Sequence, residues 1–117
     1  MSAPWPSELR LNPSKDVLSV TYDSGERMEL AAEYLRVESP SAEVQGHSPS
    51  ERKTIPGKRL VKIVRLEPVG NYAVRIAFDD GHDTGLYSWS YLHELGREHD
   101  EKWDAYLERL AVSGLSR

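Results

Sequence analysis

An acidic turn at residues 79–83 contains the side chains best suited to metal chemistry in this sequence. The carboxylates of Asp80 and Asp83 lie within two positions of the imidazole of His82. Oxygen and imidazole ligands in a tight turn can hold a divalent cation such as zinc or iron. Aspartate and glycine are also the residues that a hairpin turn requires, with the carboxylates left in water. The turn is the simpler interpretation, and a small metal site is the alternative.

A second histidine could complete such a site. His47 follows Gly46 and is far from His82 in the sequence, but the fold could bring the two imidazoles together. Two histidines and a carboxylate would resemble the facial triad of non-haem iron enzymes. The competing interpretation is that each histidine makes only local hydrogen bonds. His93 and His99 are expected on or between helices, at the surface.

The sequence lacks the patterns that accompany common catalytic machinery. It contains no cysteine, which excludes disulfides, thiolate metal sites and thiol catalysis. There is no Gly-x-Ser-x-Gly element around a nucleophilic serine, and there is no glycine-rich phosphate loop. We therefore expect a protein that has no catalytic residues, holds no cofactor and is not an enzyme.

Charge and hydropathy narrow the classes of partner. The net charge is -4 at pH 7, and no aromatic residues are interleaved with the basic residues of the central loop, which are Arg52, Lys53, Lys58 and Arg59. Nucleic acid is therefore not expected, whereas phosphate or an acidic partner could reach this loop. The longest apolar runs fall far short of the roughly 20 residues of a membrane helix. We expect a cytoplasmic protein without a signal peptide.

Alternation of apolar and polar residues predicts most of the strands. Residues 9–11, 17–22 and 28–30 are short alternating segments separated by turns, which is typical of a three-stranded meander. Residues 59–67 are apolar on both faces and predict a central strand, and the turn after it is expected at residues 68–71. Strands are also expected at residues 72–78, the clearest alternation in the chain, and at residues 84–87. The predicted core includes Val20, Val61, Ile63, Val74, Ile76 and Phe78.

Helices are expected at four places. Residues 31–36 favour a helical turn, and Ser39 is placed to cap a brief helix after it. Ser88 is placed to cap a third helix, which Gly96 would end. The last helix, over residues 99–114, carries an apolar stripe at helical spacing. The residues of this stripe are Trp103, Tyr106, Leu107, Leu110 and Ala111. The stripe predicts that this helix packs across the sheet.

Together these elements predict one α+β domain over residues 1–117, with a mainly antiparallel β-sheet, short helices and an amphipathic C-terminal helix. Residues 1–7 are expected to be a tail. Within it, Trp5 stands between two prolines, where it either docks onto a partner or packs on the sheet. Residues 48–58 carry two prolines, a glycine and several charges and are expected to be a mobile loop.

Two motifs give the chain a family resemblance. Residues 34–47, which begin Tyr34-Leu35-Arg36, and residues 80–92 together resemble the small domains that are similar to the N-terminal domain of gamma-butyrobetaine hydroxylase. The resemblance covers about residues 8–95 and leaves out the last helix. Domains of this type stand alone in bacteria with unknown function. They also precede the catalytic domain of gamma-butyrobetaine and trimethyllysine hydroxylases, and in plastids they are fused to an iron–sulfur carrier ATPase.

The resemblance also implies a metal site that this sequence has altered. In the hydroxylases, three cysteines and one histidine of this domain hold zinc. The matching positions here are Ser39, Ser41 and Val44 for the cysteines and His82 for the histidine. A serine hydroxyl is a poor zinc ligand and valine offers none. The departure predicts that the family's zinc site is absent here, and that His82 instead hydrogen-bonds to the Ser39–Ser41 segment.

In each fusion of this family another domain performs the chemistry. The resemblance therefore implies a non-enzymatic accessory role for this chain, in which it binds a protein partner. That partner would be an iron–sulfur carrier ATPase or an iron-dependent oxygenase. The alternative is a small metal-binding protein that uses His82 with Asp80 or Asp83, and with His47.

Overall fold

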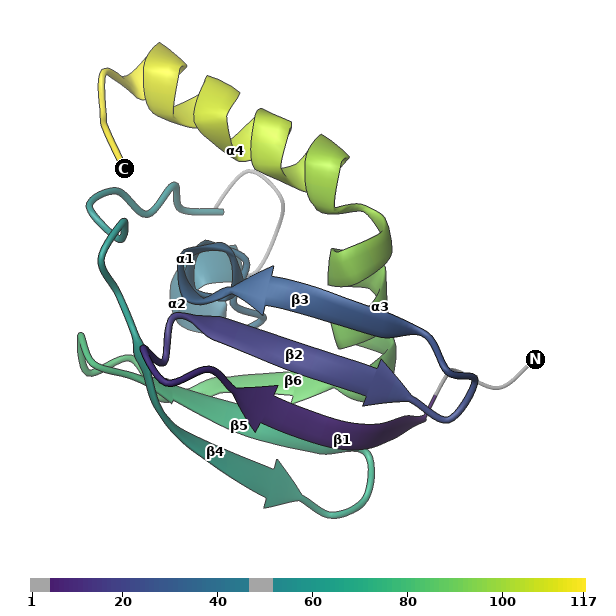
Figure 1. Ribbon diagram of the computed structural model, residues 1–117. Helices are drawn as coiled ribbons and strands as arrows, with labels where there is room; N and C mark the ends of the chain where they lie inside the picture. Colours follow the sequence, from purple (N-terminus) through teal and green to yellow (C-terminus); the bar gives the residue numbers. More distant parts are fainter. Residues whose placement is uncertain (1–4, 47–51) are drawn as a thin grey trace.

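The computed structural model describes residues 5–46 and 52–117. In these residues three strands and two helices are followed by three more strands and two more helices, and Figure 1 shows their arrangement. The strands are β1 (Pro6–Leu11), β2 (Val17–Tyr22), β3 (Arg27–Ala31), β4 (Ile63–Val69), β5 (Ala73–Phe78) and β6 (Gly85–Ser88). The helices are α1 (Ala32–Val37), α2 (Ala42–Gln45), α3 (Trp89–Arg97) and α4 (His99–Ser113).

The strands form two antiparallel sheets of three strands each. Their orders are β1-β2-β3 and β4-β5-β6, so each sheet is a simple meander along the chain. In β2 the alternation of the sequence becomes an alternation of faces, because Leu18, Val20 and Tyr22 are buried and the residues between them are not. The predicted α+β class with antiparallel strands is confirmed, and the strands are divided between two sheets.

One apolar core joins the two sheets to α1 and α3. Leu18 and Val20 come from the first sheet, Val74 and Ile76 from the second, and all four are fully buried in one cluster with Leu35, Leu92 and Leu95. The six residues predicted for the core are buried without exception. Val20, Ile63, Val74 and Ile76 are 0% exposed, Phe78 is 2% and Val61 is 7%.

The prediction of a central strand at residues 59–67 is wrong. β4 begins only at Ile63 and lies at the edge of its sheet, and β5 is the central strand. A turn closed by the Val61 amide and the Lys58 carbonyl precedes it, and Leu60 in this turn is 83% exposed. The strand also continues through Pro68, where a turn was expected. Proline is tolerated there because an edge strand leaves one row of amides unpaired.

Two helix boundaries also differ from the predictions. Ser41, and not Ser39, caps α2, because its hydroxyl accepts a hydrogen bond from the Glu43 amide. Gly96 lies inside α3 and does not end it. Its role is close packing, since a Cβ on Gly96 would stand 2.0 Å from the sulfur of Met28. Ser88 caps α3 as predicted.

Helix α4 matches the predicted C-terminal helix in extent but not in position. It ends at Gly114, whose φ of +69° is the left-handed conformation that favours glycine. Tyr106 and Leu110 are buried, yet they pack with Val37 and Ile55 in a second apolar cluster and not across the sheet. Figure 1 shows α4 along the top of the molecule, above α1. Leu107 and Ala111 of the predicted stripe are exposed.

The predicted tail ends earlier than expected. β1 already begins at Pro6, so residues 6 and 7 of the predicted tail belong to the sheet. Trp5 is 49% exposed, and its carbonyl accepts a hydrogen bond from Asp23. Residues 48–51 of the predicted mobile loop lie outside the described residues, and its mobility stays a prediction. In the described residues no helix is both long and apolar enough to span a membrane.

Candidate functional site

His82 lies at the tip of the β5–β6 hairpin and points into the protein. Its side chain is 3% exposed, beside the ring of Phe78. The imidazole Nε2 is 2.9 Å from the Ser39 hydroxyl, and Nδ1 is 3.1 Å from a carboxylate oxygen of Glu43. The hairpin is thereby tied to the chain between α1 and α2. The predicted contact between His82 and the Ser39–Ser41 segment is confirmed.

The other positions of the family's zinc site are occupied by groups that do not bind zinc. The Ser41 hydroxyl is 2.8 Å from that of Thr84 while it caps α2. The Ser39 hydroxyl also accepts a hydrogen bond from the Ser41 amide, at 3.2 Å. Val44 is buried and offers no donor atom. A set of two hydroxyls, one valine and one imidazole does not fit structural zinc, which needs thiolate or imidazole ligands.

Asp80 is held by two basic side chains. Its carboxylate lies 2.8 Å from Arg36 Nε and 2.7 Å from Lys58 Nζ, and it accepts a hydrogen bond from the His82 amide. Partial burial raises the pKa of Asp80, but the hydrogen bonds from Lys58, His82 and Arg36 outweigh it and lower the pKa to about 2. Asp80 therefore connects the hairpin to α1 and to the segment before β4.

The predicted metal residues are only partly brought together. Asp83 is exposed and makes no ion pair within the described residues, and His47 lies outside them. Across residues 5–46 and 52–117, no group of three or more histidine, aspartate and glutamate side chains is placed to hold a metal ion. His82 and Asp80 are neighbours, but the atoms that would bind a metal are already engaged with protein groups. Metal binding by this set stays a prediction for metal analysis.

Replacing His82 with alanine is expected to lower the free energy of unfolding by about 1–2 kcal/mol, the usual range for a lost buried hydrogen bond. The Ser39 hydroxyl would lose its imidazole partner in a buried position. Urea unfolding of the two proteins measures the difference, and elemental analysis should find metal at background in both. Loss of stoichiometric metal with unchanged stability would contradict the structural role.

The stability of the protein is expected to fall as the pH drops below about 6.5. Burial, followed by the positive charge of Arg36, lowers the pKa of His82 below its usual 6.5, although Glu43 and Asp80 act in the opposite direction. Below pH 6.5 the unfolded chain therefore takes up the proton more readily than the folded chain, and folding loses free energy.

A His82→Gln variant isolates this contribution because glutamine does not titrate. The parent should lose more stability than the variant between about pH 7.5 and 5 in urea unfolding. An equal loss in both proteins would show that His82 is not responsible.

Treatment with a chelator is expected to leave the melting temperature unchanged. One apolar core joins both sheets through the packing of its side chains, and a ligand that does not bind the native state cannot stabilise it. Thermal unfolding with and without EDTA is the measurement. A chelator-induced drop of about ten degrees would mean that bound metal supports the fold.

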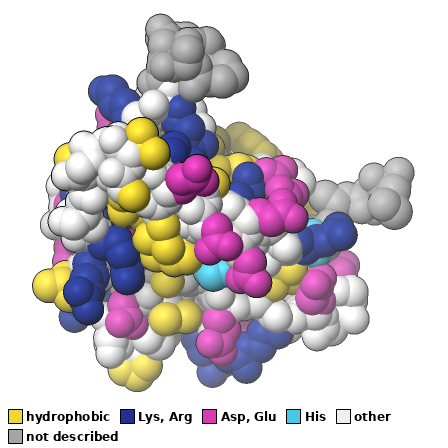
Figure 2. All heavy atoms as spheres, turned by 90° about the horizontal axis from the view of Figure 1, so that it is seen from above, with side chains coloured by type: hydrophobic (Ala, Val, Ile, Leu, Met, Phe, Trp, Pro, Cys, Tyr) yellow, Lys and Arg dark blue, Asp and Glu magenta, His cyan; other side chains and the backbone are white. Residues whose placement is uncertain are grey.

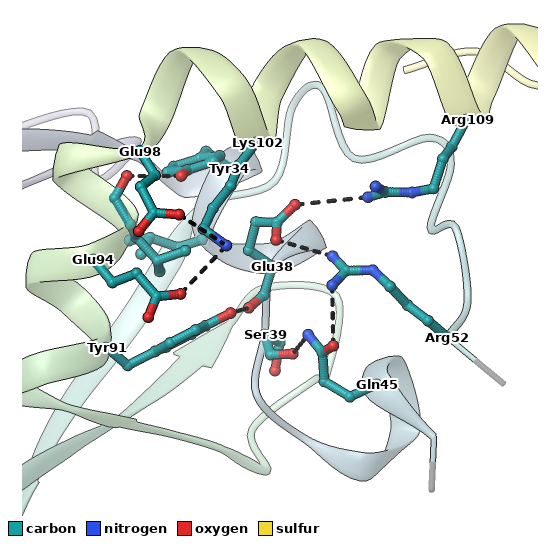
Figure 3. Close-up of polar contacts among 12 residues, drawn as sticks. Tyr34, Glu38, Ser39, Gln45, Arg52, Tyr91, Glu94, Glu98, Lys102 and Arg109 are labelled. Carbon is teal, nitrogen blue, oxygen red and sulfur yellow. Dashed lines mark hydrogen bonds and ion pairs between the residues drawn. The ribbon is translucent and has the colours of Figure 1, made fainter. Parts of the chain in front are cut away.

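A second polar cluster, around Glu38, was not predicted from the sequence. Glu38 follows α1, and its side chain is 2% exposed. One carboxylate oxygen is 2.9 Å from Arg52 Nη2, and the other is 3.7 Å from Arg109 Nη2 on α4. Figure 3 shows both guanidinium groups pointing at this carboxylate from opposite elements. The cluster joins α1, the segment after the described gap, and α4.

Neighbouring side chains extend this cluster. Arg52 also donates to the side-chain oxygen of Gln45, whose amide donates to the Ser39 carbonyl. The hydroxyl of Tyr91 donates to the Glu38 carbonyl. Burial and the nearby charge of Arg52 lower the pKa of Arg109, while Glu38 raises it. The hydrogen bonds of Gln45 connect this cluster to Ser39, the partner of His82.

Spacing could have indicated that Glu38 and Arg109 both face the protein, although not that they pair with each other. Glu38 lies four positions after the buried Tyr34, so the two share one side of the α1 segment. Arg109 stands three positions after Tyr106, within the face of α4 that packs on the protein. A charged residue inside an apolar stripe signals a buried ion pair.

Two adjoining hollows lie beside α4. One, of about 440 Å³, is lined by Thr54, Ala105, Glu108, Arg109, Val112 and Ser113. The other, of about 300 Å³, is lined by Glu38, Arg52, Glu98, Glu101, Lys102, Ala105 and Arg109. Because Ala105 and Arg109 line both, the hollows form one groove along the helix. Figure 2 shows acidic and basic side chains interspersed with apolar ones on the face that carries α4.

Comparison with known proteins finds one family and several solved structures. The family model described as gamma-butyrobetaine hydroxylase-like, N-terminal, matches residues 9–93. No curated protein matches the chain. The match ends within α3, in agreement with the extent of the resemblance seen in the sequence, and it leaves α4 outside.

Three solved structures are similar over most of their length. Two are NMR solution structures whose alignments cover 99% of this chain. The first is 44% identical, with 91% of its own chain covered and a TM-score of 0.84. The second is 43% identical, with 86% of its own chain covered and a TM-score of 0.85. The third is the crystal structure of a protein of unknown function of the DUF971 family from Acidithiobacillus ferrooxidans. It is 37% identical, with 78% of this chain and 91% of that chain covered and a TM-score of 0.65.

Proposed function

We propose that this chain, which belongs to the family of gamma-butyrobetaine hydroxylase-like N-terminal domains, is a non-enzymatic accessory domain that binds a protein partner. The solved relative from Acidithiobacillus ferrooxidans is described as having unknown function. The proposal therefore depends on the geometry of this chain's own residues.

The observation that carries the proposal is that the polar groups around His82 are engaged with one another. The imidazole is bound to Ser39 and Glu43, and Asp80 is bound to Arg36 and Lys58. A nucleophile or a general base needs a free reacting atom within reach of a substrate. These side chains instead hold a hairpin, a helix and a loop together. The arrangement favours a scaffold that presents a surface.

The class of partner is proposed from the contexts in which similar domains are found. An iron–sulfur carrier ATPase and an iron-dependent oxygenase each work beside such a domain, in the same polypeptide. A stand-alone domain would serve the same chemistry as a separate subunit. We therefore propose that the partner belongs to iron–sulfur or iron-dependent oxygenase metabolism, and that this chain acts as a binding subunit that needs no cofactor of its own.

Titration of the purified chain into a purified iron–sulfur carrier ATPase, and separately into an iron-dependent oxygenase from the same organism, tests the proposal. Isothermal titration calorimetry should give a one-to-one complex with one of them, with a Kd on the order of 1 μM, typical of a transient interface. Bovine serum albumin is the control protein. Absence of binding to both proteins would overturn the proposal.

A further inference from the structure

The groove along α4 has an excess of unpaired acidic side chains. Lys102 pairs with Glu94 and Glu98, and Arg52 and Arg109 both pair with Glu38. Each cation that lines the groove therefore lies near a carboxylate, and Arg52 and Arg109 share that of Glu38. Glu101 and Glu108 line the groove too, and both are exposed and form no ion pair within the described parts of the chain. Basic side chains of a partner would complement the free carboxylates of Glu101 and Glu108.

The same groove is polar at one end and apolar at the other. Glu101, Ala105, Glu108 and Val112 follow one another at spacings of four, three and four, which places them in one stripe along α4. Ala105 is small and leaves room above the helix. Val112 is 82% exposed at the rim of the larger hollow, so an apolar side chain seated there would cover it.

The length of the groove matches a secondary-structure element. Its lining residues on α4 run from Glu101 to Ser113, which corresponds to roughly 18 Å of helix. Three turns of a second helix have a similar length. The stripe spacing of four and three is the pattern into which the side chains of a neighbouring helix pack.

From these observations we infer that the groove between α4 and Thr54 receives a basic, amphipathic helix of the protein partner. Lysine or arginine side chains of that helix bind Glu101 and Glu108, and an apolar side chain enters the hollow beside Ala105 and Val112. This is the helix-in-groove mode of recognition. The inference rests on the proposed function and adds to it the site and the chemistry of the partner.

The experiment uses the full ¹⁵N-labelled chain and a synthetic helical peptide of leucine and lysine, with leucine at every third and fourth position. The amide signals of α4 and of residues 52–54 should shift on titration. A peptide with glutamate in place of lysine should bind at least about tenfold more weakly, because it would meet the unpaired carboxylates. Equal binding of the two peptides, or shifts confined to other elements, would overturn the inference.

Variants separate the groove from the rest of the surface. Val112→Lys and Glu108→Lys are each expected to weaken binding of the basic peptide at least about tenfold, because each adds positive charge to the surface that the lysines of the peptide contact. Leu60→Lys is the matched control, since Leu60 is as exposed as Val112 (83%) but lies on a turn. It should bind as the parent does. Circular dichroism checks that each variant is folded.

The same variants distinguish the proposed function, which is binding of a protein partner, from the proposed docking site, which is the groove. If the ATPase or the oxygenase binds the parent and Leu60→Lys but not Val112→Lys, the groove is the docking site. If it binds all three equally, the partner function stands and the groove is not its site. Concentration-dependent dimerisation of the parent that Val112→Lys abolishes would show a second copy of this chain in the groove and would also overturn the inference.

Discussion

Replacement of Glu38 by alanine is expected to destabilise the protein by about 3–5 kcal/mol, the range for removing one partner of a buried ion pair. The Glu38 side chain is 2% exposed and stands between Arg52 and Arg109. Without the carboxylate, two guanidinium groups would face each other in a site of low dielectric constant. Their repulsion and lost hydration would oppose folding and would loosen α4 from α1.

Urea unfolding of the parent and of Glu38→Ala measures this effect. Glu8→Ala is the matched control, because Glu8 and Arg10 form an exposed pair at 3.0 Å; surface pairs contribute about 0–1 kcal/mol. A variant in which Glu38, Arg52 and Arg109 are all replaced by methionine should recover much of the loss, since no unpaired charge remains. A loss below about 1 kcal/mol in Glu38→Ala would contradict the importance of this pair.

Local patterns in the sequence predict much of the fold. The meander of β1, β2 and β3 follows from alternation and turn residues, and β5 follows from the clearest alternation of all. Helix α4 follows from its spacing and from Gly114, which adopts the left-handed conformation expected after a helix. These features depend on neighbours within a few residues, where pattern and structure are closely linked.

The packing of these elements against one another could not be predicted from local patterns in the sequence. Val61, Ile63 and Val64 give the segment before Arg65 apolar residues on both faces, yet Val64 is 48% exposed on an edge strand. An apolar stripe on α4 predicts that the helix packs, but not on what. Its partners, Val37 and Ile55, come from a helix and a loop far away in the sequence. Alternation and spacing carry no information about such distant partners.

The candidate site was predicted only in part, because some of its contacts join residues that are far apart in the sequence. The contact between His82 and Ser39 follows from the family resemblance, which places the two positions on one site, and the structure has it at 2.9 Å. The pairing of Asp80 with Arg36 and Lys58 was not predicted, because no local pattern links the three residues. The turn at residues 79–83 is therefore a hairpin whose carboxylate serves as a tertiary anchor.

A variant that carries Ser39→Cys, Ser41→Cys and Val44→Cys is expected to bind one zinc ion per chain. The resemblance places the family's three zinc cysteines at these positions, and the structure keeps them close to one another. The Ser39 hydroxyl is 2.9 Å from His82 Nε2 and 3.2 Å from the Ser41 amide, and the Val44 amide donates to the Ser41 carbonyl at 3.0 Å. Three thiolates and one imidazole are a complete set of ligands for structural zinc.

Elemental analysis and thermal unfolding check this expectation. The parent should contain zinc at background, while the triple variant should contain one equivalent and gain about 4 kcal/mol of stability when free zinc exceeds its Kd a thousandfold. EDTA should reverse the gain. Adding His82→Ala to the triple variant should weaken zinc binding, because the fourth ligand is lost. A folded triple variant without zinc would show that this chain has changed the geometry of the site as well as its ligands.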